Sequence, residues 1–161
     1  MVVIIMGTTG AGKTTVGTML AAQLNWQFAD ADGFHPPANI EKMSHGIPLN
    51  DADRAPWLAA MRKAILEWIA VGKNVMLACS ALKRAYRDEL RPSPEIKIVY
   101  LKGSYALFAE RIRQRHGHFA GEGILAGQFA DLEEPVDAIM VDAAKSPEEI
   151  VAEIRKQLGL S

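Results

Sequence analysis

VVIIMGTTGAGKT, residues 2–14, is the stretch that decides the fold. The apolar run Val2–Met6 predicts a strand that is buried on both faces of a sheet. Residues 7–14 match the pattern G-x-x-x-x-G-K-[ST], and a helix is expected to follow from Gly12 to Leu24. A strand, a glycine-rich turn and a helix in this order form the context in which the pattern builds a phosphate cradle.

The cradle pattern supplies backbone amides, a cation and a hydroxyl at fixed positions. Glycines let the chain wrap closely around phosphates, and the N-terminal end of the helix adds a positive field. Lys13 is predicted to reach the β- and γ-phosphates of ATP, and the Thr14 hydroxyl to bind Mg²⁺. A glycine-rich turn that binds nothing would not need lysine and threonine at these offsets. The predicted nucleotide-binding residues are Gly7, Thr8, Thr9, Gly10, Ala11, Gly12, Lys13, Thr14 and Thr15.

Strands and helices alternate along the rest of the chain. Further strands are expected at 27–30, 74–79, 96–101 and 138–142, and helices at about 53–72, 84–91, 104–115 and 146–158. This alternation predicts an α/β fold with a parallel sheet and helices on both faces, in a single domain spanning residues 1–161. Loops 7–14, 30–36 and 80–83 would then meet at the carboxyl edge of the sheet, where such folds bind ligands.

Composition narrows the class of protein. The chain has 161 residues, 49% of them hydrophobic, and a net charge of −1, so it can build a core but has no strong field for nucleic acid or anionic membranes. Its one cysteine, Cys79, cannot form an intrachain disulfide and is expected to be inert at the end of a buried strand. We find no stretch of membrane-span length and no signal peptide, and so expect a cytoplasmic protein.

Two aspartates follow the second predicted strand. Alternate residues of an extended segment point the same way, so the carboxylates of Asp30 and Asp32 are expected to face the γ-phosphate together. One would orient Mg²⁺, and the other would accept the proton of an attacking hydroxyl. A solvated acidic turn beside Gly33 is the competing interpretation. The upstream cradle makes the functional interpretation the stronger one.

Arginines gather at the end of the helix predicted at 104–115. Arg111, Arg113 and Arg115 precede a glycine-rich stretch, and an arginine over a transferring phosphoryl group stabilises its spreading charge. Gly117, Gly121 and Gly123 predict a mobile lid at about 116–127 that closes and excludes water. The alternative is a solvated basic helix end that favours the helix dipole, and Arg113 in particular is expected to be solvated.

Several further segments resemble those of gluconate kinases. They are residues 30–36 (DADGFHP), 39–43 (NIEKM), 46–58 (GIPLNDADRAPWL), 79–88 (CSALKRAYRD), 117–119 (GHF), the pair Gln128-Phe129 and the pair Leu132-Glu133. The resemblance runs from Met1 to the final helix, and its segments at 46–58 and 79–88 are far more specific to the family than the cradle alone. It implies the P-loop nucleoside-triphosphate hydrolase fold in the nucleoside-monophosphate-kinase-like form that shikimate kinase shares. That form has a five-stranded parallel sheet, an acceptor region after the second strand and a lid.

The same resemblance implies an activity and a set of site residues. The activity is ATP-dependent phosphorylation of D-gluconate to 6-phosphogluconate with Mg²⁺, often in a homodimer. The implied catalytic residues are Lys13, Asp32 as the base, and Arg115. The implied metal ligands are Thr14 and Asp30, and Arg111 joins the nucleotide contacts. The implied substrate contacts are Asp32, His35, Arg54, Lys83, Arg87 and Gln128.

The chemistry of gluconate agrees with these residue types. A carboxylate favours an arginine fork or a lysine, and hydroxyls need mixed donors and acceptors such as aspartate and histidine. The lid segment departs from the family pattern, which usually has a proline after the histidine-phenylalanine pair and a serine before the glutamine. Here Gly127 stands in place of that serine, which predicts a looser lid or a lost hydrogen bond.

Other functions stay open at this point. Another sugar acid or shikimate is an alternative acceptor to gluconate, and a non-catalytic ATP-sensing paralogue would keep the same cradle. A nucleoside monophosphate kinase is less favoured because no base-reading motif is found. A switch-type GTPase is disfavoured because no aspartate ends the strand at 74–79 and no Asn-Lys-x-Asp motif is present.

Overall fold

The computed structural model describes residues 1–116 and 122–160 and contains one five-stranded sheet in the order β2-β3-β1-β4-β5. Every neighbouring pair of strands is parallel. The strands are β1 Val2–Met6, β2 Gln27–Asp30, β3 Val75–Ala78, β4 Lys97–Lys102 and β5 Ile139–Asp142. The predicted α/β class and five-stranded parallel sheet are therefore confirmed.

Seven α-helices and one short 3₁₀ helix accompany these strands within the described residues. They are α1 Lys13–Leu24, η1 Ala31–Phe34, α2 Pro37–Ser44, α3 Asp51–Ala70, α4 Arg84–Leu90, α5 Tyr105–His116, α6 Glu122–Asp131 and α7 Pro147–Leu158. Capping boxes stabilise the N-termini of α3 and α7. Asn50 and Asp53 form the first of them, and Ser146 and Glu149 form the second. No described helix combines the length and the apolar character that a membrane crossing requires.

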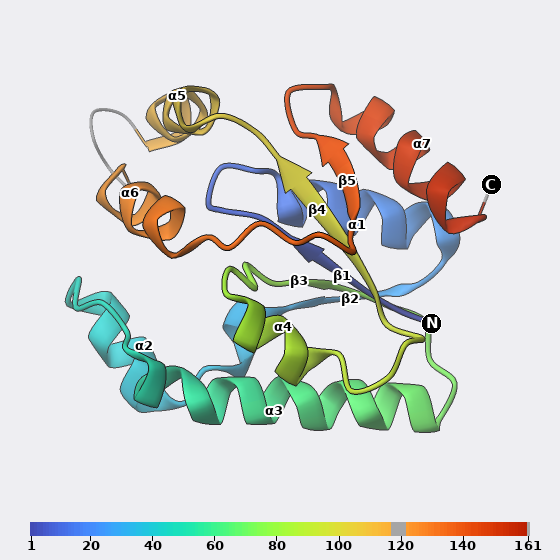
Figure 1. Cartoon of the computed structure of the whole chain (residues 1–161), viewed down its shortest axis with the longest axis horizontal. Helices are drawn as coiled ribbons and strands as arrows, with labels where there is room; N and C mark the ends of the chain where they lie inside the picture. Colours follow the sequence, from blue (N-terminus) through green and yellow to red (C-terminus); the bar gives the residue numbers. More distant parts are fainter. Residues whose placement is uncertain (117–121, 161) are drawn as a thin grey trace.

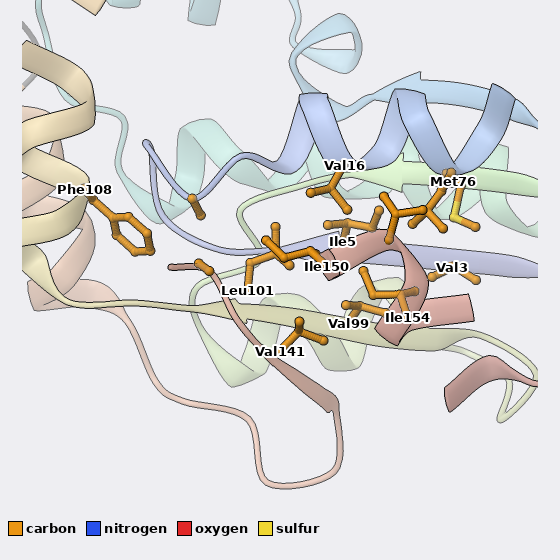
Figure 2. Close-up of a cluster of buried hydrophobic side chains, with 14 of the residues drawn as sticks. Val3, Ile5, Val16, Met76, Val99, Leu101, Phe108, Val141, Ile150 and Ile154 are labelled. Atoms are coloured by element: carbon orange, nitrogen blue, oxygen red, sulfur yellow. The ribbon is translucent and has the colours of Figure 1, made fainter. Parts of the chain in front are cut away.

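The sheet separates two layers of core. In β1 every residue is buried, and successive side chains alternate between the two faces. Val3 and Ile5 join the cluster formed with α1, α5 and α7, and Figure 2 shows Ile5 close to Val16 of α1 and Ile150 of α7. Val2, Ile4 and Met6 join the second cluster, which α3 and α4 cover (Figure 1). A strand buried on both faces is what the continuous apolar run predicted.

The topology opens a crevice at the carboxyl end of the central strands. Strands β2 and β3 lie on one side of β1, and β4 and β5 on the other. In such sheets ligands bind where the strand order reverses, beyond the carboxyl ends. Figure 1 shows α2 and α6 beyond this end of β1 and β3.

The segment predicted as a lid is partly helical. Of the lid at 116–127, residues 117–121 lie outside the described residues, whereas 122–127 form the first part of α6. Gly123 and Gly127 disfavour a helix on intrinsic propensity. The helix forms because Leu125 is fully buried and Phe129 packs against the same core cluster. A Cβ atom added at Gly127 would meet no other atom within 4 Å, so the serine of the family pattern would fit there.

Candidate active site

The loop between β1 and α1 takes a conformation that only glycine allows easily. Gly10 has a φ angle of 83° and Gly12 one of 93°, both in the left-handed region. A Cβ atom on Gly10 would lie 3.1 Å from both the Cβ and the carbonyl oxygen of Phe108. The backbone therefore curls tightly, with α5 packed behind it, and leaves its inner side for a ligand.

Lys13 lies across this loop. Its Nζ donates a hydrogen bond to the carbonyl oxygen of Thr8 at 3.0 Å. Burial lowers the pKa of the Lys13 ammonium, whereas negative charge on Cys79, Asp32 and Asp30 would raise it. A bound polyphosphate would add negative charge beside the ammonium and favour its charged form.

A pocket of about 320 Å³ lies against the loop and collects residues from five parts of the chain. It is lined by Thr9, Gly10, Gly12, Lys13, Thr14 and Thr15, by Asp30, Ala31 and Asp32, by Ala78, Cys79 and Ser80, by Trp57, and by Arg115, Ile124 and Gln128. The loops predicted at 7–14, 30–36 and 80–83 thus contribute to one site. Burial raises the pKa of the Cys79 thiol to about 12, which agrees with an inert cysteine.

Asp30 and Asp32 line the same pocket, although the geometric premise that predicted this was wrong. Strand β2 ends at Asp30, and the chain then turns into η1 and does not continue extended. The Asp30 side chain caps that turn, because its Oδ1 accepts a hydrogen bond from the Asp32 backbone amide at 2.9 Å. This contact holds the Asp32 backbone in place at the edge of the pocket.

The oxygen groups in the pocket fit Mg²⁺ bound together with a nucleotide. Thr14, Asp30 and Asp32 offer a hydroxyl and two carboxylates, which are the hard ligands that Mg²⁺ prefers. Among the described residues no group of three or more His, Cys, Asp or Glu side chains is placed to hold a metal by itself. A cation held by one or two protein oxygens and completed by phosphates and water matches this arrangement.

The three arginines of α5 have different surroundings. Arg115 lines the pocket. Arg111 instead donates to the carbonyl oxygens of Gly10 at 3.2 Å and Ala143 at 2.5 Å, so its guanidinium braces the loop from outside. Arg113 is exposed and pairs with Glu110 at 3.4 Å, as expected for a solvated residue. Arg111 was predicted to contact the nucleotide directly. Its hydrogen bonds indicate instead that it supports the backbone of the phosphate loop.

Two of the predicted substrate residues meet in a cluster with groups that sequence reasoning missed. We call Asp51, Arg54, Lys83 and Tyr86 the cation cluster. Tyr86 Oη donates to Asp51 Oδ1 at 2.5 Å, and Arg54 Nη1 donates to Tyr86 Oη at 2.9 Å. Lys83 Nζ lies 3.3 Å from the same Asp51 oxygen. The hydrogen bonds from Tyr86 and Lys83 lower the pKa of Asp51, so its charge holds both cations in place.

The cation cluster also touches α6. Arg54 Nη2 lies 4.0 Å from Asp131 Oδ2, at the last residue of that helix. One turn earlier on α6, Gln128 Oε1 accepts a hydrogen bond from the Thr9 amide at 2.6 Å. Gln128 was predicted to contact substrate. It lines the pocket, and its oxygen is bonded to the phosphate loop.

His35 is held against Trp57. The two rings stack at 4.6 Å between centroids, with 9° between their planes. Trp57 is 5% exposed, lines the pocket and donates from Nε1 to the carbonyl oxygen of Ala31 at 2.8 Å. Burial lowers the pKa of His35, with Asp32 opposing and Arg54 reinforcing this shift.

The prediction of Arg87 as a substrate contact needs correction. Its side chain is 7% exposed and does not line the pocket. Its guanidinium donates to the carbonyl oxygens of Ala81 at 2.8 Å, Leu82 at 2.9 Å and Glu133 at 2.7 Å. Arg87 therefore joins the loop after β3 to the segment after α6, and its donors are occupied by the protein itself.

Replacing Arg87 with methionine is expected to lower the free energy of unfolding by about 2–4 kcal/mol, because buried carbonyl oxygens lose a charged donor. Urea unfolding measures this change. Arg84→Met on the same helix, at an exposed position, is the control and should change stability by less than about 0.5 kcal/mol. A stable Arg87→Met variant with a strongly raised KM for the acceptor would restore the substrate role.

The chain is similar to known small-molecule kinases. The family model described as "Shikimate kinase" matches residues 9–159. The gluconokinase of Gluconobacter oxydans (strain 621H) is 45% identical over 155 residues, which cover 94% of this chain and 87% of that protein. The thermoresistant gluconokinase of Escherichia coli (strain K12) is 42% identical over 154 residues, covering 92% and 88%. The crystal structure of a gluconokinase from Sinorhizobium meliloti 1021 superposes with a TM-score of 0.87 at 42% identity, covering 98% of this chain and 90% of that one.

Proposed function

The chain belongs to the gluconokinase family, and from this premise we propose that it transfers the γ-phosphate of ATP to D-gluconate, giving 6-phosphogluconate and ADP. One observation carries the proposal. A glycine-built phosphate loop, two aspartates and an arginine line a single pocket, and the cation cluster begins one helical turn away from that pocket on α3. The site thus offers a nucleotide half and an acceptor half.

In the nucleotide half, the amides of the loop and Lys13 hold the phosphates of ATP. Thr14 and Asp30 would hold Mg²⁺, and the bound cation would supply positive charge that offsets the negative charge of the phosphates. Arg115 lines the same pocket and stabilises the charge that spreads over the transferring phosphoryl group. Arg111 keeps Gly10 in place from behind the loop.

In the acceptor half, Arg54 and Lys83 bind the gluconate carboxylate. Arg54 offers a planar fork for such a group, and Lys83 offers a point charge. Asp51 and Tyr86 hold both cations, so they are already oriented before the acceptor arrives. Asp32, beside the phosphate loop, accepts the proton of the attacking hydroxyl.

Coupled ADP release with ATP and Mg²⁺ tests the function across gluconate, other aldonates, shikimate, simple sugars and nucleoside monophosphates. Selective stimulation by gluconate is the expected result. Stimulation by a different acid alone would keep the phosphotransfer and overturn the acceptor assignment. ATP binding without stimulation by any acceptor would favour a non-catalytic ATP sensor.

Arg54→Ala is expected to raise the KM for gluconate roughly 10- to 100-fold with a smaller change in kcat, because a charge-assisted contact to the carboxylate is lost. Initial rates against gluconate concentration measure it. Arg62→Ala is the matched control on the same helix, since Arg62 donates to the Glu89 carbonyl at 2.9 Å. Equal KM values for the two variants would remove Arg54 from the acceptor site.

The homodimer that the family resemblance implies and the cytoplasmic location expected from the sequence are both proposals. Light scattering on the purified 17.6 kDa chain tests the first, since a dimer has twice that mass. A monomer at assay concentrations would contradict it.

A further inference from the structure

Asn39 of α2 is a buried polar side chain beside the acceptor region, and the mechanism above leaves it without a role. It is 3% exposed. Its Nδ2 donates to the carbonyl oxygen of Asp53 at 2.8 Å and lies 3.1 Å from Nδ1 of His35. One amide group therefore contacts both the first turn of α3 and the imidazole ring.

These two contacts fix the position of the imidazole proton. The Asp53 carbonyl can only accept, so the Asn39 group that faces it must be the NH₂ group. An NH₂ group has two donors and no acceptor, so Nδ1 of His35 accepts the second hydrogen bond. A neutral imidazole whose Nδ1 accepts carries its proton on Nε2.

The surroundings of the ring keep this nitrogen available. Trp57 covers one face of the ring, and Asn39 occupies Nδ1. No hydrogen bond joins Nε2 to any residue in the described part of the chain. The charged groups that act on the ring are Asp32, which favours the imidazolium, and Arg54, which disfavours it together with burial.

We propose that Asn39 is a positioning residue that holds His35 as the Nε2–H tautomer, so that His35 donates a hydrogen bond to a hydroxyl oxygen of the polyhydroxy-acid acceptor. This inference rests on the proposed function. A donor at His35 and an acceptor at Asp32 together match a hydroxyl group, which both accepts and donates. The pair distinguishes a hydroxyl-bearing acceptor from one that presents a carbonyl or a methyl group at the same place.

Long-range ¹H–¹⁵N NMR of the His35 ring in the ligand-free protein tests the tautomer directly. The expected spectrum is that of the Nε2–H form at neutral pH. A spectrum of the Nδ1–H form, or of an imidazolium at that pH, would overturn the proposal. This experiment needs no substrate. It therefore tests the tautomer even if gluconate does not stimulate ADP release and the proposed function is wrong.

The kinetic arm uses Asn39→Ala and Asn39→Asp. A carboxylate at position 39 accepts where the amide donated, so Asn39→Asp is expected to move the ring proton to Nδ1 or to charge the ring. Asn39→Ala is expected to leave a mixture of tautomers. Both variants should raise the KM for gluconate by roughly threefold to tenfold, the scale of one hydrogen bond, with the KM for ATP unchanged.

Ile40→Ala is the control for the integrity of α2, because Ile40 is the next residue and is 53% exposed. If Asn39 only joins α2 to α3, its variants will lower stability while the tautomer and the KM for gluconate of the folded protein stay as in the parent. That outcome would overturn the positioning role. If Asn39→Asp does not fold, the kinetics of Asn39→Ala and the NMR spectrum of the parent protein still test the positioning role.

Discussion

Lys13→Ala is expected to lower kcat/KM for gluconate phosphorylation by roughly a thousandfold. Lys13 supplies the one side-chain cation of the phosphate loop, and it lies in the pocket with its Nζ bonded to the neutral carbonyl of Thr8. Transfer of the phosphoryl group spreads negative charge over its oxygens, and a fixed ammonium beside them stabilises that charge more than it stabilises bound ATP. Most of the loss should therefore appear in kcat.

Steady-state kinetics at saturating ATP and gluconate measure this loss, and urea unfolding shows that the fold is kept. Lys63→Ala is the matched control, since Lys63 is exposed on α3. The control should keep the parent rate. Transfer by Lys13→Ala at the parent rate would contradict the assignment of residues 7–14 as the catalytic phosphate loop.

The parts of the fold that the sequence predicted are those that depend on local pattern. A run of five apolar residues and a glycine-lysine motif define β1, the loop and α1, and these appear with nearly the predicted bounds. The apolar side chains of this run point to both faces of the strand. Burying all of them requires helices on both sides of the sheet. The position of the site at the carboxyl edge then follows from the topology.

Helix α6 could not be predicted in this way. Its glycines argue for a loop, and no capping signal marks its start in the sequence. It forms because Leu125 reaches the core between strands and helices that are distant in sequence. Tertiary packing overrides local propensity here, and only the three-dimensional structure shows it.

Among the site residues too, the sequence predicted the roles that depend on local pattern and missed those that depend on tertiary packing. Lys13, Asp32 and Arg115 line the pocket, as their positions in the sequence predicted. Arg87 has the residue type expected of a carboxylate ligand, but its donors bind backbone carbonyls. Residue type gives the chemistry that a side chain offers, whereas its partner depends on which loops the fold brings beside it. Asn39 was missed for this reason, because its two partners lie on different segments.

Asp32→Asn is expected to lower kcat by roughly a hundredfold or more while ATP binding changes little, the usual scale for a lost general base. The substitution keeps the size of the side chain and the Asp32 backbone amide, which donates to Asp30 at 2.9 Å, so the turn of η1 is preserved. What disappears is the carboxylate that takes the proton of the attacking hydroxyl. ATP binding by calorimetry and single-turnover transfer rates separate these two effects.

The Asp32 carboxylate also affects the pKa of His35, and the direction of this effect helps to interpret the kinetics of the variant. Asp32 raises the pKa of His35, so its replacement keeps that ring neutral to lower pH, and protonation of His35 cannot explain a slower reaction. Asp88→Asn, at an exposed position of α4, removes one carboxylate away from the pocket and should retain the parent kcat. An Asp32→Asn variant with unchanged turnover would show that the acceptor proton leaves by another route. If the variant lost ATP binding instead, Asp32 would belong among the Mg²⁺ ligands. Its carboxylate would then support ATP binding through the metal.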